Sequence, residues 1–494
     1  MKHACSLLPV VAALLAPALS AAPTPAKPSS VGNIMYVGDS ITHGVNSASY
    51  RWQLHKVFAD NSLAYTELGI NTGNTPGHLG GSALKNTTAD YAGSTFRNAH
   101  CAQSSGRAWE VSGNASGGKP ANQKYQRYNG TNIKNWLGLD KKTNRGEEYS
   151  GPVFTKSEAP ARVCIMIGTN DLLSDTKQGS TLVANKDREI ADLLKDVDAI
   201  VATIRKAAPK AQISINEIPA WCMAGTMANA DVHEAVREYN DRLRKWAQKK
   251  KITVINVNRG LADVTSTKPL EGIPSMFTAD KLHPAAQGDL IIAGNMARAL
   301  GWGGRTAGLS RKAASALSPL PSFSADGASA AGQNAYKLKG GDSVSASFSP
   351  AAEFTVEFTP TVGNGSKDGW DADSALSVTI PGAGSLSVEE GFIRWNGTPL
   401  FSGDMSANKE PIRICNLPGN DASSIPGGIY IWLDDMLIGE ALPTAAPAGD
   451  SLSFSLAGSA DAHLTLHAAD PAHAFAPATA PSPASPKAKP KKLR

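Results

Sequence analysis

Between residues 31 and 302, short apolar runs alternate with longer stretches in which apolar residues recur at helical spacing. The short runs are typical of buried strands, and the longer stretches are typical of amphipathic helices. The predicted strands lie at 34–37, in the first half of 162–171, at 212–218 and at 253–257. The predicted helices include one with Tyr50, Leu54, Val57 and Phe58 on one face, and then 183–207, 230–248 and 290–300. This alternation predicts a three-layer α/β/α domain with a parallel sheet covered on both faces, whose ligand cleft lies at the carboxyl ends of the strands.

The pattern changes after about Trp302. Residues 303–330 are rich in Gly, Ser, Ala and Pro, which is typical of a linker. Short stretches with period-two alternation follow, at 354–358, 376–380, 392–395, 412–415, 429–433 and 452–456. Such stretches between turn residues predict an all-β sandwich over 331–468, similar to jelly rolls. The Pro-, Ala- and Lys-rich end, 469–494, is expected to be disordered.

The first 22 residues read as a signal peptide. Lys2 and His3 precede the apolar stretch 7–19, and small residues follow at 20–22. The apolar stretch is too short for a stable membrane span, and Pro9 and Pro17 interrupt it. The sequence therefore predicts export, to the periplasm or out of the cell, and no membrane span.

Three polar segments lie at the ends of predicted strands or just before a predicted helix. Gly38-Asp39-Ser40-Ile41 comes directly after the strand at 34–37, and Gly168-Thr169-Asn170-Asp171 ends the second strand. Asp280-Lys281-Leu282-His283 precedes a helix that opens at Pro284. A hydroxyl, an amide and an Asp/His pair at such places suggest a hydrolase.

These three segments resemble motifs of the SGNH hydrolases, also called the GDSL esterase/lipase family. The first family block resembles 38–42, the third resembles 168–171 and the fifth resembles 280–284. The second block is a single glycine, which we place at Gly106 within Ser104-Ser105-Gly106-Arg107. Alternative positions for that glycine are Gly77, Gly80 and Gly81. The resemblance covers roughly 31–302 and does not extend to the rest of the chain.

The resemblance implies a role for each motif residue. Ser40 would be the nucleophile, His283 the base that takes its proton, and Asp280 the carboxylate that orients the imidazole. The oxyanion hole would consist of the backbone N–H groups of Ser40 and Gly106 and the side-chain amide of Asn170. Asp39 and Thr169 would support these groups. No metal or organic cofactor is implied.

Each of these residues has a structural alternative. Asp39 and Ser40 are common in turns and helix caps, Asn170 and Asp171 can form an Asx-turn, and His283 can be a solvated residue before a proline. Their joint occurrence in the order Ser, Asn, Asp-His favours the catalytic interpretation. An α/β-hydrolase is disfavoured because Thr42 stands where its G-x-S-x-G motif requires glycine.

Charge and cysteines add little. Five basic residues of the tail account for the net charge of +5, so a nucleic-acid partner is not expected: Lys487, Lys489, Lys491, Lys492 and Arg494. Cys101 and Cys222 lie in predicted loops and could form a disulfide, whereas Cys164 and Cys415 are expected to be unpaired. No cysteine spacing is typical of a zinc site.

Several residues are candidates for substrate contacts. The polar insertion 71–136 could form a lid or substrate wall, with Trp109, Tyr125, Tyr128 and Trp136. Arg51, Arg107 and Arg127 could bind an acidic sugar or be surface charges. In the sandwich, Trp370, Trp395 and Trp432 could stack on sugars or fill the core, and Asp368, Asp371 and Asp373 are a calcium candidate.

The sequence thus predicts a secreted serine esterase that removes acetyl or other short acyl groups from a glycan, such as a sialate or a hemicellulose. A lipase or lysophospholipase is the alternative within enzymes. The alternative from another class is a carbohydrate-binding or adhesion protein without activity. The sequence predicts no oligomeric state and no particular substrate-binding residue.

Overall fold

A computed structural model describes this protein over residues 30–470, with gaps. The residues inside this range that are not described are 45–48, 73–88, 114–129, 150–157, 177–180, 223–229, 269, 308–322, 333, 348–353, 364–373, 381, 418, 420, 422–424, 444–450 and 460. The predicted signal peptide and tail lie outside the described residues, apart from 469 and 470. No described helix is long and apolar enough to cross a membrane.

The first domain is built on a mainly parallel sheet. Strand β1 (Ser30–Gly38) pairs in parallel with β7 (Arg162–Met166), which pairs with β8 (Gln212–Asn216), which pairs with β9 (Thr253–Ile255). On its other side, β1 pairs in parallel with β2 (Ala64–Leu68) along its first half and with β6 (Ala99–Ala102) at its end. The short β3 (Asn71–Thr72) pairs antiparallel with β6, and β4 (Ala89–Tyr91) and β5 (Ser94–Phe96) form a separate hairpin.

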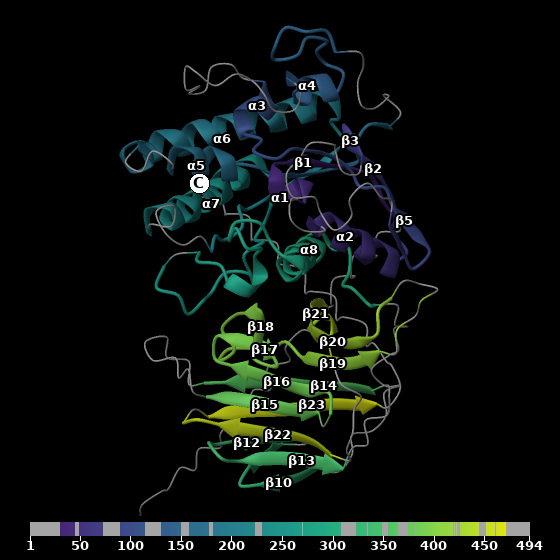
Figure 1. Ribbon diagram of the computed structural model, residues 1–494, viewed down its shortest axis with the longest axis vertical. Helices are drawn as coiled ribbons and strands as arrows, with labels where there is room; N and C mark the ends of the chain where they lie inside the picture. The colour runs from purple at the N-terminus through teal and green to yellow at the C-terminus, as the bar shows by residue number, and fades with distance from the viewer. Residues whose placement is uncertain are drawn as a thin grey trace, which may run out of the picture. The chain divides into compact units, whose positions relative to one another are not determined.

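Helices cover both faces of this sheet (Figure 1). Ile34 and Tyr36 of β1 pack with α2 (Ser49–Asp60) and α8 (Ala286–Leu300), whereas Met35 and Val37 pack with α3 (Ala108–Ser112), α6 (Thr181–Ala207) and α7 (Ala230–Lys250). Successive side chains of a strand point to opposite faces, so a continuous apolar strand needs cover on both. The remaining helices of this domain are α1 (Ser40–His43), α4 (Ile133–Trp136), α5 (Thr169–Thr176) and a 3₁₀ turn, η3 (Pro274–Met276).

The second domain consists of two antiparallel sheets that pack face to face through buried apolar side chains. One sheet has the order β10 (Phe323–Asp326), β13 (Ser343–Ser347), β22 (Ser451–Ala457), β15 (Ala375–Ile380), β16 (Gly384–Glu389), β17 (Phe392–Trp395) and β18 (Thr398–Ser402). The other has the order β11 (Ser329–Gly332), β12 (Ala335–Leu338), β23 (Ala462–Asp470), β14 (Phe354–Val362), β19 (Ile412–Leu417), β20 (Gly428–Leu433) and β21 (Met436–Leu442).

These two architectures confirm the predicted fold class, an α/β/α domain with a parallel sheet followed by a β-sandwich. Each of the six strands predicted after residue 350 lies inside an observed strand. The range predicted as a linker, 303–330, does contain structure. Its end includes β10 and the start of β11. Most side chains of these two strands are small and exposed, so the sequence shows no alternation of apolar and polar residues there.

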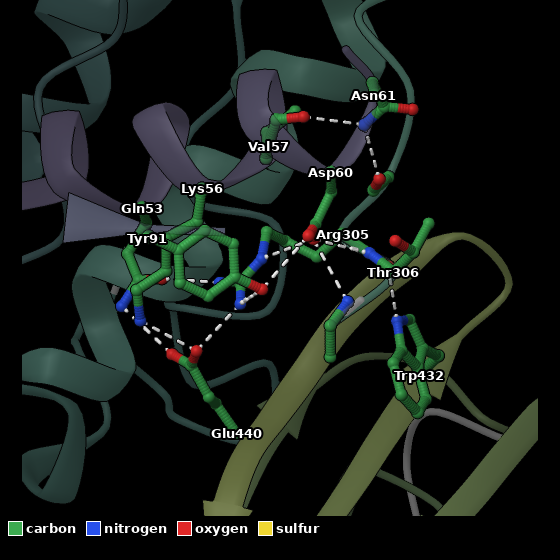
Figure 2. A network of polar contacts seen from close by, with 12 residues as sticks. Gln53, Lys56, Val57, Asp60, Asn61, Tyr91, Arg305, Thr306, Trp432 and Glu440 are labelled. Carbon is green, nitrogen blue, oxygen red and sulfur yellow. Dashed lines mark hydrogen bonds and ion pairs between the residues drawn. The ribbon is translucent and has the colours of Figure 1, made fainter. Parts of the chain in front are cut away.

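The start of the same range is buried in a network of polar contacts with both domains (Figure 2). The Arg305 guanidinium donates to Asp60 Oδ2 of α2 at 3.0 Å and to Glu440 Oε1 of β21 at 2.8 Å. Lys56 Nζ lies 2.7 Å from the same Glu440 oxygen. The indole N–H of Trp432 donates to the Arg305 carbonyl at 2.8 Å. Residues just past Trp302 therefore connect α2 to the sandwich, and they are not a free spacer.

Candidate active site

Ser40 lies where the central strand ends and a short helix begins. Strand β1 ends at Gly38, Asp39 caps α1, and Ser40 is the first residue of that helix. The Ile41 N–H donates to Asp39 Oδ1 at 3.0 Å, which satisfies one of the free amides of the helix start. A Cβ at Gly38 would stand 2.2 Å from Thr42 Oγ1 and 2.6 Å from the Met166 carbonyl, so only glycine fits this turn. The turn holds Ser40 at the carboxyl edge of the sheet.

His283 contacts both Ser40 and Asp280. Its Nε2 lies 2.7 Å from Ser40 Oγ, and its Nδ1 lies 2.7 Å from Asp280 Oδ2. An ionised carboxylate only accepts, so Nδ1 carries the proton and Nε2 is left to accept from the Ser40 hydroxyl. This arrangement has the connectivity of a nucleophile, a base and an orienting acid.

The Asp280 carboxylate is held by its own turn. Its Oδ1 accepts from the N–H groups of Leu282 and His283, at 2.9 and 3.0 Å, and from the Thr278 hydroxyl at 2.8 Å. Lys281, between them, has φ 61°. Partial burial by itself raises the pKa of Asp280, but the two N–H donors and the imidazole outweigh it, so its pKa is lowered. Asp280 is therefore ionised across the neutral range, as the histidine contact requires.

The predicted oxyanion donors differ in their contacts. Ser40 N–H, in the first turn of α1, has no hydrogen-bond partner among the described residues. The Asn170 side-chain N–H donates to the Gly106 carbonyl at 3.1 Å. The Gly106 N–H, however, donates to the Gln103 carbonyl at 3.0 Å, because residues 103–106 form a tight turn with Ser105 at φ 58°. In this conformation the Gly106 N–H is engaged within its own turn, and the resemblance did not anticipate this.

The other two motif residues are buried next to these groups. Burial raises the pKa of Asp39 to about 6, although the Ile41 N–H partly offsets it. Thr169 is buried as well, and its side chain acts in the same direction as the Ile41 N–H on the pKa of Asp39. The alternative positions for the second block, Gly77, Gly80 and Gly81, lie outside the described residues.

Sequence reasoning missed the role of Arg51. This residue is 1% exposed, so it is neither a surface charge nor available to an acidic sugar. Its guanidinium donates to the carbonyls of Thr42 at 2.7 Å and His43 at 3.2 Å, at the end of the helix that begins with Ser40. A cation at this position hydrogen-bonds the free carbonyls at the helix end and interacts favourably with the negative end of the helix dipole. The signal was present, because Arg51 stands three residues before Leu54 on the predicted buried face.

Most other candidates are buried or not described. Four tryptophans are buried and so are not exposed for stacking on sugars: Trp109 and Trp136 from the insertion, and Trp395 and Trp432 from the sandwich. Cys101 and Cys222 are both free, so the possible disulfide is absent. Arg107 is partly buried and is the N-cap residue of α3. The candidates outside the described residues are Tyr125, Arg127, Tyr128, Asp368, Trp370, Asp371 and Asp373.

Comparison with known proteins agrees with this geometry. Residues 104–291 match the GDSL-like Lipase/Acylhydrolase family, a range that includes Gly106, Asn170, Asp280 and His283 but begins after Ser40. That family is also known as the SGNH hydrolases, and the matched residues are less than half of the chain. No curated protein matches the chain.

Several solved structures are similar to 54% of the chain. They include a carbohydrate esterase family 3 protein from Talaromyces cellulolyticus, with 16% identity, 95% of its own chain covered and a TM-score of 0.33. A family 3 carbohydrate esterase from Clostridium thermocellum has 17% identity, 93% coverage and a TM-score of 0.32. A mutant acetyl esterase with an acetate ion has 16% identity, 95% coverage and a TM-score of 0.33.

Proposed function

We propose that this GDSL/SGNH-type protein is an exported serine esterase that removes acetyl or other short acyl groups from glycans. The observation that carries the esterase chemistry is the chain of contacts from Ser40 through His283 to Asp280. In this reaction Ser40 attacks the ester carbonyl while His283 takes its proton and later gives it to the leaving sugar hydroxyl. The negative charge on the carbonyl oxygen is stabilised by the Ser40 N–H and the Asn170 amide.

The preference for a short acyl group is supported by the exposed surface. A fatty acyl chain gains about 0.8 kcal/mol for each buried methylene, so a lipase needs an open apolar groove. Within the described ranges, the large hydrophobic side chains that are exposed are Leu139 and Val264. Around Ser40, the contacts of His43 with Ser104 and of Asn170 with Gly106 are polar. Polar groups of this kind suit sugar hydroxyls better than a lipid.

The test is the release of product from p-nitrophenyl acetate, butyrate and octanoate and from acetylated glycans, including sialates and xylan. We expect kcat/KM to be highest for acetate, and acetate to be released from at least one glycan. A groove that buried two further methylenes would favour the longer ester by about tenfold, so a preference of that size for octanoate would indicate a lipase. Failure of a fluorophosphonate to label Ser40 would indicate a binding protein without activity.

A further inference from the structure

Two consecutive side chains at the start of α5 hold the loop that carries Gly106. The Asn170 amide donates to the Gly106 carbonyl at 3.1 Å. The next residue, Asp171, accepts the Ala108 N–H with both carboxylate oxygens, at 3.2 and 3.1 Å. The loop 106–108 is therefore held near both ends by neighbouring residues of one helix turn. The position of this loop relative to Ser40 therefore depends on the position of the first turn of α5.

We propose that Asp171 is a positioning residue for the oxyanion hole, which it maintains by fixing the 106–108 loop against Asn170. This inference rests on the proposed function, because the loop matters only if an oxyanion forms beside Ser40. Asp171 itself does not touch the substrate. It acts through the Gly106 carbonyl, which accepts from the Asn170 amide and so orients it.

The contact of Asp171 is sensitive to its charge. Loss of surrounding water raises the pKa of Asp171 to about 7, while the Ala108 N–H and Arg107 act in the opposite direction. The charged or titratable groups that face it are Arg107 and Glu110 from α3, Asp196 from α6 and Tyr239 from α7. A carboxylate is a stronger acceptor than the neutral acid, so protonation weakens its hold on Ala108. Activity should therefore fall in acid as Asp171 takes up its proton.

The test uses Asp171→Asn in the full chain, with p-nitrophenyl acetate as substrate. The asparagine side chain keeps the shape of aspartate but has no charge. We therefore expect kcat to fall by about tenfold to a hundredfold, as is typical of a displaced catalytic group, and KM to change by less than about twofold. The acid side of the wild-type pH profile should include a titration that the profile of Asp171→Asn lacks. A variant with wild-type kcat and a wild-type acid limb would overturn the proposal.

Asp196→Asn is the matched variant. Asp196 accepts from the Ser112 hydroxyl at 2.9 Å, at the other end of α3, and its charge contributes to the raised pKa of Asp171. Removing this charge should favour ionised Asp171, so the acid limb should move to lower pH with little change in kcat at pH 8. An unmoved acid limb would contradict the proposal even if Asp171→Asn did not fold. Failure of the proposed function itself would be recognised separately, because the wild type would then not hydrolyse the ester.

Discussion

Two buried carboxyl groups at the active-site edge, Asp39 and Asp171, and one at the contact between the two domains, Glu440, have pKa values that are shifted in opposite directions. At the active-site edge, burial raises the pKa of Asp39 to about 6 and that of Asp171 to about 7. Between the domains, burial by itself would raise the pKa of Glu440, but Arg305 and Lys56 outweigh it and the pKa is lowered to about 2. The difference follows from the partners, because Asp39 and Asp171 accept from backbone N–H groups whereas Glu440 meets two cations.

This comparison separates two uses of buried charge. Carboxyls with raised pKa values are destabilising when ionised, and such groups are frequent where a protein performs chemistry. A buried carboxylate between two cations contributes to holding the parts of a fold in one arrangement, and it is costly to leave unpaired. We therefore expect changes at the edge to affect rate more than stability, and changes at the domain contact to affect stability more than rate.

The largest effect should come from Ser40→Ala and His283→Ala. Each removes one member of the proposed nucleophile and base pair, so kcat on p-nitrophenyl acetate should fall by at least about a thousandfold. The melting temperature should stay close to that of the wild type. Ser214→Ala is the control, since Ser214 is also buried in this domain but contacts Cys164 Sγ in the sheet. Activity within about tenfold of the wild type for either variant would contradict the assigned chemistry.

The next largest effect should come from shortening the chain. A chain that ends at Trp302 loses the sandwich and Arg305, and it leaves Asp60 buried without its cation. A chain that ends at Ala307 keeps Arg305, Thr306 and Ala307 as donors to Asp60 Oδ2. We expect both chains to be less stable than the full protein, and the one ending at Trp302 to be the less soluble of the two. Equal stability of the full protein and the chain ending at Trp302 would show that the contact between the domains does not contribute to stability.

Arg305→Ala tests the domain contact by a single substitution. Removing one partner of a buried ion pair typically costs about 3–5 kcal/mol, because the remaining carboxylates lose their compensation. Arg237→Ala is the matched control, because Arg237 pairs with Glu234 on the exposed face of α7 and such pairs contribute about 0–1 kcal/mol. Urea unfolding of both variants measures the difference. If Arg305→Ala lowered the free energy of unfolding by less than about 1 kcal/mol, the domain contact would contribute no more to stability than a surface ion pair.

The smallest effect should be the pH dependence of stability, which differs in sign between the regions. The raised pKa of Asp171 means that the folded state binds its proton more tightly, so this group lowers the free energy of unfolding as pH rises from about 4 to about 7. The lowered pKa of Glu440 stabilises the folded state above the unfolded value, and this stabilisation is lost as pH falls from 4.5 to about 2.

Urea unfolding from pH 3 to pH 8 checks both signs. Relative to Asp171→Asn, the wild type should lose stability toward pH 7. At neutral pH the wild type should be more stable than Glu440→Gln, and this difference in the free energy of unfolding should shrink toward pH 3. Differences that do not change with pH would show that these carboxyls titrate as they do in the unfolded chain.

Local sequence was sufficient for some features of the site and not for others. The Asp280 and His283 pair was predictable because three residues of one turn separate them, and the strand before Ser40 was predictable from its apolar run. The turn that engages the Gly106 N–H was not, because it depends on a positive φ at Ser105, which is uncommon for a residue other than glycine. The contact of Asp171 with Ala108 was also missed, because these residues lie 63 positions apart in the chain.

The sequence by itself determined the order and type of the elements with a clear apolar pattern, because apolar periodicity and turn residues act over a few positions. It also determined which side chains stand at strand ends. Only the tertiary structure decided that Ser40 and His283, 243 residues apart, meet at 2.7 Å, and that Arg305 joins α2 to the sandwich. These contacts depend on how the sheet orders its strands and on which faces pack together, and no local pattern encodes the distance between residues so far apart in the chain.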